Sequence, residues 1–214
     1  MSDLKTEAIV LKRVNFNESD RIVTFLTPEG CFSAIARGVR REKSKLAGGI
    51  EMFSLVKIVL HQRDSSRVTA PDLSGQFGIL TSAKPVEFYQ NIISNLETLD
   101  LAASFLKQTS RATRQISSKE LFILLQQSLY FLNYYVNDPC KTQLISIYFK
   151  INLSRICGEE INVFYDRDGQ KLESNNTYDW DDFEKVLIKN LHSGNIDQNI
   201  IKLLRLILTT QLAV

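Results

Sequence analysis

The sequence of 214 residues has few of the residue types from which metal, disulfide and many catalytic sites are built. It contains three cysteines, two histidines, four prolines and one tryptophan. Cys31, Cys140 and Cys157 are widely separated and odd in number, which excludes a disulfide framework and a zinc site made of Cys-x-x-Cys pairs. Such cysteines are typical of a reducing cytoplasm, where each acts as a small apolar side chain.

The motifs of several enzyme classes are missing as well. No Gly-x-x-x-x-Gly-Lys-Ser/Thr loop is present to hold ATP phosphates, and no Gly-x-Ser-x-Gly nucleophile turn occurs. Residues 166–169 (DRDG) look superficially like the start of a calcium loop. The glycine comes two positions early, however, and Thr177 stands where such a loop needs glutamate, so the segment predicts a turn. The sequence therefore predicts no enzyme, no metal site and no cofactor.

Long apolar runs and a strong excess of one charge are also lacking. Polar or charged residues interrupt both of the most apolar stretches, 121–136 and 200–208, so neither reaches the roughly 18 apolar residues of a membrane span. The N-terminus has no basic region followed by an apolar one, as a secretory signal would. We therefore expect a cytoplasmic protein with no membrane partner. The net charge is only +2, which does not by itself indicate a nucleic-acid binder.

The first part of the chain has the pattern of strands. Short segments rich in Ile, Val, Leu and Phe are separated by polar turns, and Pro28-Glu29-Gly30 supplies turn residues between the second and third segments. The predicted strands cover residues 6–14, 21–27, 31–37, 52–62 and 67–73. Five strands in about 75 residues predict a small closed or nearly closed barrel.

Beyond residue 84 the apolar spacing becomes helical. Ser117 and Glu120 form a capping-box pattern, and Gly158 is a natural helix end. The predicted helices cover residues 85–108, 117–136, 139–157, 179–192 and 197–212, and a small hairpin turns at Asp168-Gly169. The fold class is therefore α+β with two domains: a β domain over residues 1–78 and an all-α helical domain over 79–214, with the hairpin inserted near 160–176.

The small net charge is unevenly distributed. Residues 1–80 hold 12 Lys or Arg against 9 Asp or Glu, whereas the remainder of the chain has a net charge of −1. Residues 37–45, here called the basic loop, contain five of those cations and one acid, and two glycines, Gly48 and Gly49, follow. A loop of this kind between two barrel strands could follow a phosphate backbone, because lysine and arginine neutralise phosphates and release counterions. A solvated loop that only keeps the protein soluble would have the same composition.

Other residues could widen a nucleic-acid surface around the basic loop. Three further cations lie near the first strands: Lys12, Arg13 and Arg21. Four phenylalanines are candidates for stacking on bases: Phe16, Phe25, Phe32 and Phe53. Each cation could equally be an ordinary surface residue, and most phenylalanines of a small barrel fill its core.

Three blocks near the N-terminus resemble the N-terminal domain of RecO, the bacterial DNA repair and recombination mediator. They are Thr6–Arg13 (TEAIVLKR), Glu18–Gly30 (ESDRIVTFLTPEG) and Ala36–Gly48 (ARGVRREKSKLAG), and their order and spacing fit the family. The segment Phe149–Gly158 (FKINLSRICG) also resembles the family's helix that ends in glycine. The resemblance is specific over about residues 5–60 and looser across the helices.

The resemblance implies an N-terminal OB-fold barrel, a C-terminal helical domain and work in the RecF pathway of DNA recombination. It implies binding of single- and double-stranded DNA, annealing of complementary strands and loading of RecA onto DNA coated with single-strand-binding protein (SSB). The partners it implies are RecR and the acidic C-terminal tail of SSB, and its location is the bacterial nucleoid. The residues it assigns to DNA are Arg37, Arg40, Arg41, Lys43, Lys45 and Arg21, with Arg21 alternatively pairing with Glu18 or Asp20.

The sequence departs from the family at one place. Many members carry two cysteine pairs that bind zinc after the helix ending in glycine, but residues 159–176 contain no cysteine. The chain is also somewhat short for the family. We therefore expect a zinc-less, shortened member whose hairpin closes by ordinary packing.

Two other functions fit the same sequence. An adaptor would capture the acidic SSB tail in its helical domain, with Lys107, Arg111 and Arg114 at the rim of an apolar groove, and its barrel would bind nucleic acid weakly. The same three residues are equally well explained as a solvated loop. Alternatively, the barrel would bind RNA, as other OB folds do.

Overall fold

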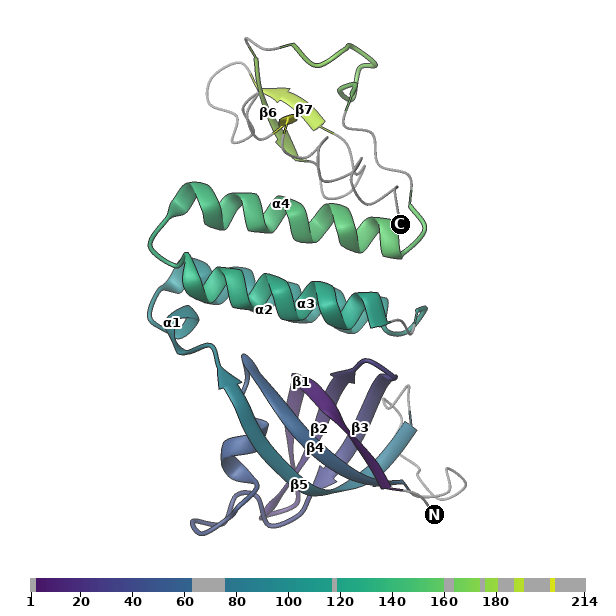
Figure 1. Cartoon of the computed structure of the whole chain (residues 1–214), viewed down its shortest axis with the longest axis vertical. Coiled ribbons are helices and arrows are strands. Elements are labelled where there is room, and N and C mark those ends of the chain that lie inside the picture. The colour runs from purple at the N-terminus through teal and green to yellow at the C-terminus, as the bar shows by residue number, and fades with distance from the viewer. Residues whose placement is uncertain are drawn as a thin grey trace. The chain divides into compact units, whose positions relative to one another are not determined.

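The computed structural model describes residues 3–62, 76–116, 119–159, 164–173, 176–180, 187–190 and 201–202. The chain divides into two compact units, residues 1–138 and 139–214. Figure 1 shows the elements of both units along the chain.

The first unit contains a closed barrel of five strands. They are β1 (Asp3–Phe16), β2 (Asp20–Thr27), β3 (Gly30–Ala36), β4 (Ser54–Gln62) and β5 (Gln76–Phe88). Their order around the barrel is β1-β2-β3-β5-β4, and β1 closes it by pairing with β4 through its first half and with β2 through its second half. All pairs are antiparallel except β3 with β5. This order is that of an OB fold, so the predicted fold class, a barrel followed by helices, is confirmed.

The barrel core consists of the inward-facing residues of every strand and a plug at one end. Alternation along β2 places Val23 and Phe25 inside, with no exposed surface. A short 3-10 helix, η1 (Ala47–Ile50), lies between β3 and β4 and adds Ile50 to this core, while Val39 joins it from the preceding loop. Burying these apolar side chains supplies the main favourable free energy of the barrel.

The plug approaches β5 very closely at Gly49. A Cβ atom built on Gly49 would lie 2.4 Å from the Cβ atom and the carbonyl oxygen of Ala83. Because one of these atoms belongs to the backbone, no side-chain rotation can relieve the overlap. The neighbouring Gly48 has no atom within 4 Å of the same position. Packing therefore requires glycine at position 49 but not at position 48.

Three helices complete the first unit. They are α1 (Gln90–Ile93), α2 (Leu96–Ala112) and α3 (Lys119–Tyr134), with the side chain of Asn95 capping α2 by accepting from the backbone N–H groups of Glu97 and Thr98. Figure 1 shows α2 and α3 side by side. Ile9 and Leu26 face outward from the barrel, yet both are buried, because α2 contacts β1 and α3 contacts β2. The helices thus cover part of the outer face of the first two strands.

The second unit has a small core of its own. It contains α4 (Pro139–Ile156) and two short antiparallel strands, β6 (Thr177–Trp180) and β7 (Leu187–Asn190). Ile147 and Ile151 of α4 pack with Tyr178 and Leu187 of these strands. At residues 166–169 the chain makes the predicted turn, in which the Asp166 carboxylate accepts backbone N–H bonds from Asp168 and Gln170. Tyr165 and Lys171 pair across this turn.

Several sequence predictions of local structure are confirmed. The hairpin of β2 and β3 turns at Pro28-Glu29, with Thr27 opposite Gly30. The second and third predicted helices correspond to α3 and α4, and Gly158 follows α4 with a positive φ of 80°. The capping residue Ser117 lies outside the described residues.

The barrel extends further along the chain than the sequence predicts. The fifth strand predicted over residues 67–73 lies outside the described residues, and the strand that completes the barrel is β5. Residues 85–88 belong to β5, so the prediction of a helix beginning at residue 85 is wrong there. A short apolar segment such as this one fits a strand and a helix equally well, and pairing with β4 decides the outcome. The expected domain boundary at residue 78 falls inside the same strand.

The helix predicted over residues 179–192 is also wrong in its described part. Residues 179–180 belong to β6 and residues 187–190 to β7. Each strand is too short for periodicity to distinguish it from a helix, and their mutual pairing is the deciding interaction. Of the helix predicted over 197–212, residues 201 and 202 are helical and the others lie outside the described residues.

Gly49→Ala tests the contact between the plug and β5. We expect this change to lower the free energy of unfolding by about 1–3 kcal/mol, since an added methyl group in a close-packed core forces the backbone apart. Gly48→Ala is the matched control and is expected to leave the stability unchanged or slightly higher. Urea unfolding of the intact chain measures both, and equal stability of the two variants would contradict the close approach.

Candidate nucleic-acid interface

The basic loop leaves the barrel at the end of β3 and folds into consecutive tight turns before η1. The backbone N–H of Arg41 donates to the carbonyl of Gly38, and that of Ser44 donates to the carbonyl of Arg41. Gly38 has a φ of 62°, a conformation that glycine adopts without strain. Val39 is buried in the barrel core and anchors the loop from below. The loop is therefore an ordered part of the barrel.

Hydrogen bonds fasten the basic loop to the turn between β1 and β2. The N–H of Gly38 donates to Oδ1 of Asp20 over 2.7 Å, and the N–H of Arg40 donates to the carbonyl of Ser19 over 3.0 Å. Nη1 of Arg40 also donates to the carbonyl of Asn17 over 3.3 Å. Asn17 has a positive φ of 54°, which asparagine tolerates better than most residues. The loop and this turn thus form one surface.

Asp20 is the charged residue that holds the basic loop to the β1–β2 turn. The backbone N–H of Gly38 is the largest cause that lowers the pKa of the Asp20 carboxyl, and the Ser19 hydroxyl and the charges of Arg37 and Arg41 lower it further. The sequence suggests Asp20 only as a possible partner of Arg21. Its role depends on a residue 18 positions away, which a local sequence pattern does not show.

The five cations of the basic loop are all exposed. They are Arg37, Arg40, Arg41, Lys43 and Lys45. Within the described part of the chain, Arg40 is the one whose side chain makes a hydrogen bond, and that bond goes to a neutral carbonyl. Their charges consequently face solvent, which fits both a phosphate-binding loop and a solvated loop, and their contact with DNA stays a prediction.

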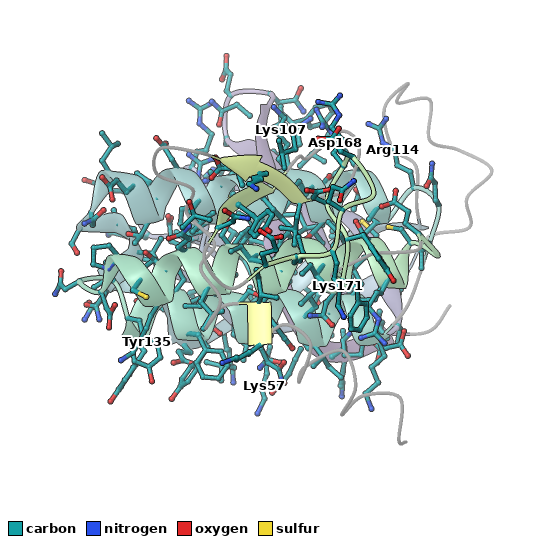
Figure 2. The ribbon with its side chains drawn as sticks, turned by 90° about the horizontal axis from the view of Figure 1, so that it is seen from above. Lys57, Lys107, Arg114, Tyr135, Asp168 and Lys171 are labelled. Carbon is teal, nitrogen blue, oxygen red and sulfur yellow. The ribbon has the colours of Figure 1, made fainter. Side chains whose placement is uncertain are left out.

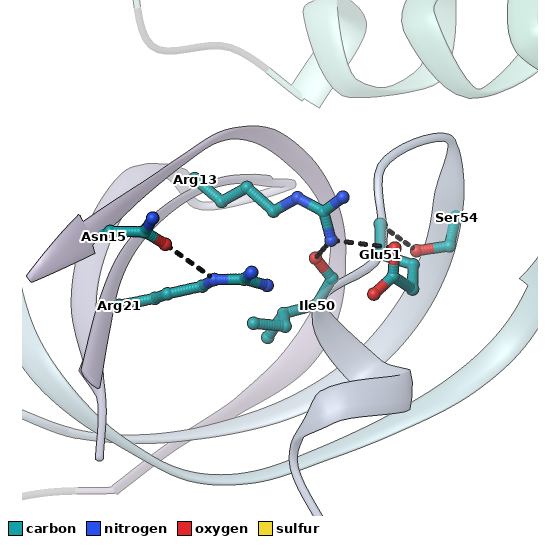
Figure 3. A network of polar contacts seen from close by, with 6 residues as sticks. All are labelled: Arg13, Asn15, Arg21, Ile50, Glu51 and Ser54. Atoms are coloured by element: carbon teal, nitrogen blue, oxygen red, sulfur yellow. Dashed lines mark hydrogen bonds and ion pairs between the residues drawn. The ribbon is translucent and has the colours of Figure 1, made fainter. Parts of the chain in front are cut away.

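The three further candidate cations lie in different environments (Figure 3). Arg13 makes a 2.7 Å ion pair with Glu51 and a 3.5 Å bond to the carbonyl of Ile50, so it ties β1 to the plug. Arg21 donates from Nε to Oδ1 of Asn15 over 3.1 Å, which differs from the alternative pairing with Glu18 or Asp20 that the sequence left open. Lys12 is exposed on β1. Contact of these three with DNA stays a prediction.

The candidate stacking residues separate clearly by burial. Phe25, Phe32 and Phe53 are buried, with at most 7% of their surface exposed, and therefore serve packing. Phe16, at the end of β1, is 39% exposed. The expectation that most of these rings fill the core is confirmed.

The candidate rim of the acidic-peptide site lies on α2 and the turn after it. Lys107, Arg111 and Arg114 are exposed and follow one another at helical spacing, which places Lys107 and Arg111 on one face of α2. In Figure 2 the side chains of Lys107 and Arg114 project away from the ribbon. None of the three lines the shallow depression of the first unit, which lies instead on the barrel around Lys5, Lys57 and Lys84.

Metal ligands do not come together in the described residues. No group of three His, Cys, Asp or Glu side chains is close enough there to hold an ion. The segment where zinc would be expected contributes a turn around Asp166, whose carboxylate already accepts backbone bonds. Carboxylates and one separate thiol, Cys157, do not fit a structural zinc ion. None of the described helices is long and apolar enough to cross a membrane.

The family comparison agrees with the geometry of the barrel. Residues 1–77 match the family model described as recombination protein O N terminal. The chain carries the N-terminal domain of the RecO family. This match covers the basic loop, the β1–β2 turn and the strands that hold them.

Individual RecO relatives extend the similarity into the helices. The DNA repair protein RecO of Acetivibrio thermocellus is 31% identical over 161 residues, which cover 74% of this chain and 58% of that protein. The proteins of the same name from Roseiflexus sp. and Heliobacterium modesticaldum are 30% and 27% identical and cover 60% and 74% of this chain. The matches cover 42% of the Roseiflexus protein and 57% of the Heliobacterium protein, so the chain spans about half the length of the curated relatives it matches.

A pH titration tests the attachment of the basic loop through Asp20. The folded pKa lies below the ordinary value of 3.8, so the ionised carboxylate holds Gly38 throughout the neutral range. The hydrogen bond of the ionised Asp20 carboxylate stabilises the folded state fully above the pKa of Asp20 in the unfolded chain. This stabilisation is lost as the pH falls through the lower pKa of the folded state. In an NMR titration we expect the chemical shift of the Gly38 amide proton to change with a midpoint below pH 3.8.

Asp20→Ala should expose the Gly38 amide to hydrogen exchange even at neutral pH, whereas Asp20→Asn should protect it partly, because an amide oxygen remains as acceptor. Glu42→Ala removes a carboxylate from the same loop without touching this bond and serves as the control. Unchanged exchange at Gly38 in Asp20→Ala would contradict the role of the carboxylate.

Proposed function

We propose that this protein is a non-enzymatic mediator of recombinational DNA repair that binds and anneals single strands. The observation that carries the proposal is the basic loop, in which five exposed cations are held on an ordered surface of an OB-fold barrel. The named function of the RecO relatives supports a role in DNA repair. The chain would act in the cytoplasm, at the bacterial nucleoid.

The mechanism we infer is electrostatic. Two complementary strands are polyanions, and their repulsion opposes pairing. A surface that neutralises phosphates lowers this cost and releases counterions, so annealing would be fastest at low salt. The order of the loop contributes because its backbone, which hydrogen bonds already hold, need not be immobilised on binding. Double-stranded DNA would bind through the same phosphate contacts.

The same proposal includes partners. From the similarity to RecO we propose RecR and the acidic C-terminal tail of SSB as binding partners, with RecA loaded onto the SSB-coated strand as the outcome. The absence of cysteine from residues 159–176 supports function without zinc. Strand annealing with and without SSB, over a salt series, tests binding and mediation together.

A charge-removal variant tests the role of the basic loop. Arg41→Ala, Lys43→Ala and Lys45→Ala together remove three side chains that make no hydrogen bond within the described residues, so the fold should persist. Each lost phosphate contact should flatten the plot of log K against log salt by about 0.7 for single strands, or about 2 in total. Fluorescence anisotropy with a labelled oligonucleotide measures this slope, and an unchanged slope would remove the loop from the interface.

The second candidate function is that of an adaptor for an acidic peptide, supported by the exposed cations of α2. Lys107→Ala, Arg111→Ala and Arg114→Ala together remove the same charge from the helices. We expect binding of the SSB tail peptide to fall about tenfold, since each exposed pair contributes about 0.2–1 kcal/mol, while DNA binding persists.

The two triple variants control for each other, because both remove three positive charges. If the helix variant lost binding of the SSB tail peptide and the loop variant left DNA binding unchanged, the adaptor would be favoured over the DNA mediator. An RNA-binding barrel would be favoured if a single-stranded RNA of the same sequence bound more tightly than DNA.

A further inference from the structure

An apolar strip is exposed on the outer face of the barrel beside the basic loop. It consists of the exposed side chains of Val14 and Phe16 and the half-buried side chains of Ile22 and Ile35. Ile22 and Ile35 alternate along their strands with the core residues Val23 and Ala34, so they face outward. Val14 lies opposite Ile22, which lies opposite Ile35, so all three share the outer face. Val14 is 46% exposed and Phe16 39% exposed. This part of the outer face is therefore open to solvent, whereas Ile9 and Leu26, further along the same strands, are buried.

Positive charges flank the apolar strip at both ends along β1. Lys12 is exposed on the same face as Val14, opposite Thr24, and therefore lies at one end. At the other end Phe16 directly precedes Asn17, whose carbonyl accepts the hydrogen bond from the Arg40 side chain. With a rise of about 3.3 Å per residue, Lys12 and Phe16 are about 13 Å apart along the strand. An apolar surface with cations at each end matches a chain that alternates phosphates and flat aromatic bases.

A strip of this kind distinguishes single-stranded from double-stranded nucleic acid by whether the faces of the bases are free. In a duplex the faces of the bases are stacked on one another, so only phosphates and groove edges reach a flat surface. In a single strand the base faces are free to stack on an aromatic ring, as they do in proteins that bind single strands. Cations alone bind both forms, whereas an exposed phenyl ring contributes only when a base is unstacked.

We propose that Phe16 is a base-stacking residue and that the apolar strip makes this barrel selective for single strands. The phosphates of the strand lie on Lys12 and the basic loop, and one base packs on the Phe16 ring beside Val14. The inference rests on the proposed function, because it assigns the substrate form to the same surface. It assigns the stacking role to one of the four phenylalanines considered from the sequence.

The test compares single-stranded and duplex DNA binding for variants of Phe16. Phe16→Ala should weaken binding of a single-stranded oligonucleotide about tenfold and leave duplex binding unchanged. The salt slope should stay at the wild-type value, because no phosphate contact is lost. Phe16→Leu keeps an apolar side chain of similar size without the ring and should show most of the same loss. Phe16→Trp should retain affinity, and its fluorescence should be quenched by the single strand but not by the duplex.

Phe131→Ala provides the matched control. Phe131 is 44% exposed on α3, so its removal takes a similar ring from another surface of the same unit and should leave both affinities unchanged. Wild-type affinity for single strands in Phe16→Ala, or an equal loss for single strands and duplex, would overturn the proposal and leave the apolar strip as a contact for protein.

This result is distinguishable from a failure of the proposed function. If the loop variant Arg41→Ala, Lys43→Ala, Lys45→Ala lost affinity and salt dependence while Phe16→Ala behaved as wild type, the DNA interface would stand and the stacking role would fall. If wild-type protein bound neither form of DNA, both proposals would fall.

Discussion

The interface depends on strand β1 pairing with two partners at once. Its first half pairs with β4 and its second half with β2, which closes the sheet and brings the β1–β2 turn beside the end of β3. The chain must then cross this end of the barrel to reach η1, and Val39 and Ile50 fix the crossing by burial. Without this closure the basic loop and the turn that holds it would not share one surface.

Closure also explains how a chain with a net charge of only +2 can present a strongly basic surface. Placing five cations in nine residues creates charge repulsion, and the hydrogen bonds of the folded loop offset this cost. Asp20 contributes a carboxylate bonded to the Gly38 backbone, and Arg40 is held by a neutral carbonyl, so the cationic groups stay solvated. The charges that would attract phosphate are therefore exposed to solvent. The hydrogen bonds of the loop backbone stabilise the loop itself.

The fold was largely predictable where a local pattern is long. The hairpin around Pro28-Glu29 and the helices α3 and α4 follow from turn chemistry and periodicity over many residues. The end of β5 and the short strands β6 and β7 were not predictable, because a segment of four residues fits either period and only pairing with another strand decides. Residues 166–169 show the opposite case, since their turn residues alone indicate the geometry at Asp166.

Residue type and spacing alone determined the kind of surface: a cluster of cations between two strands of a small barrel. Only the tertiary structure decided which side chains of that surface are available. Arg13 is paired with Glu51, 38 positions away, and three of four candidate rings are buried, which leaves Phe16 exposed. The physical reason is that residue type and spacing control local conformation, whereas burial and ion pairing depend on segments that folding brings together from far apart in the chain.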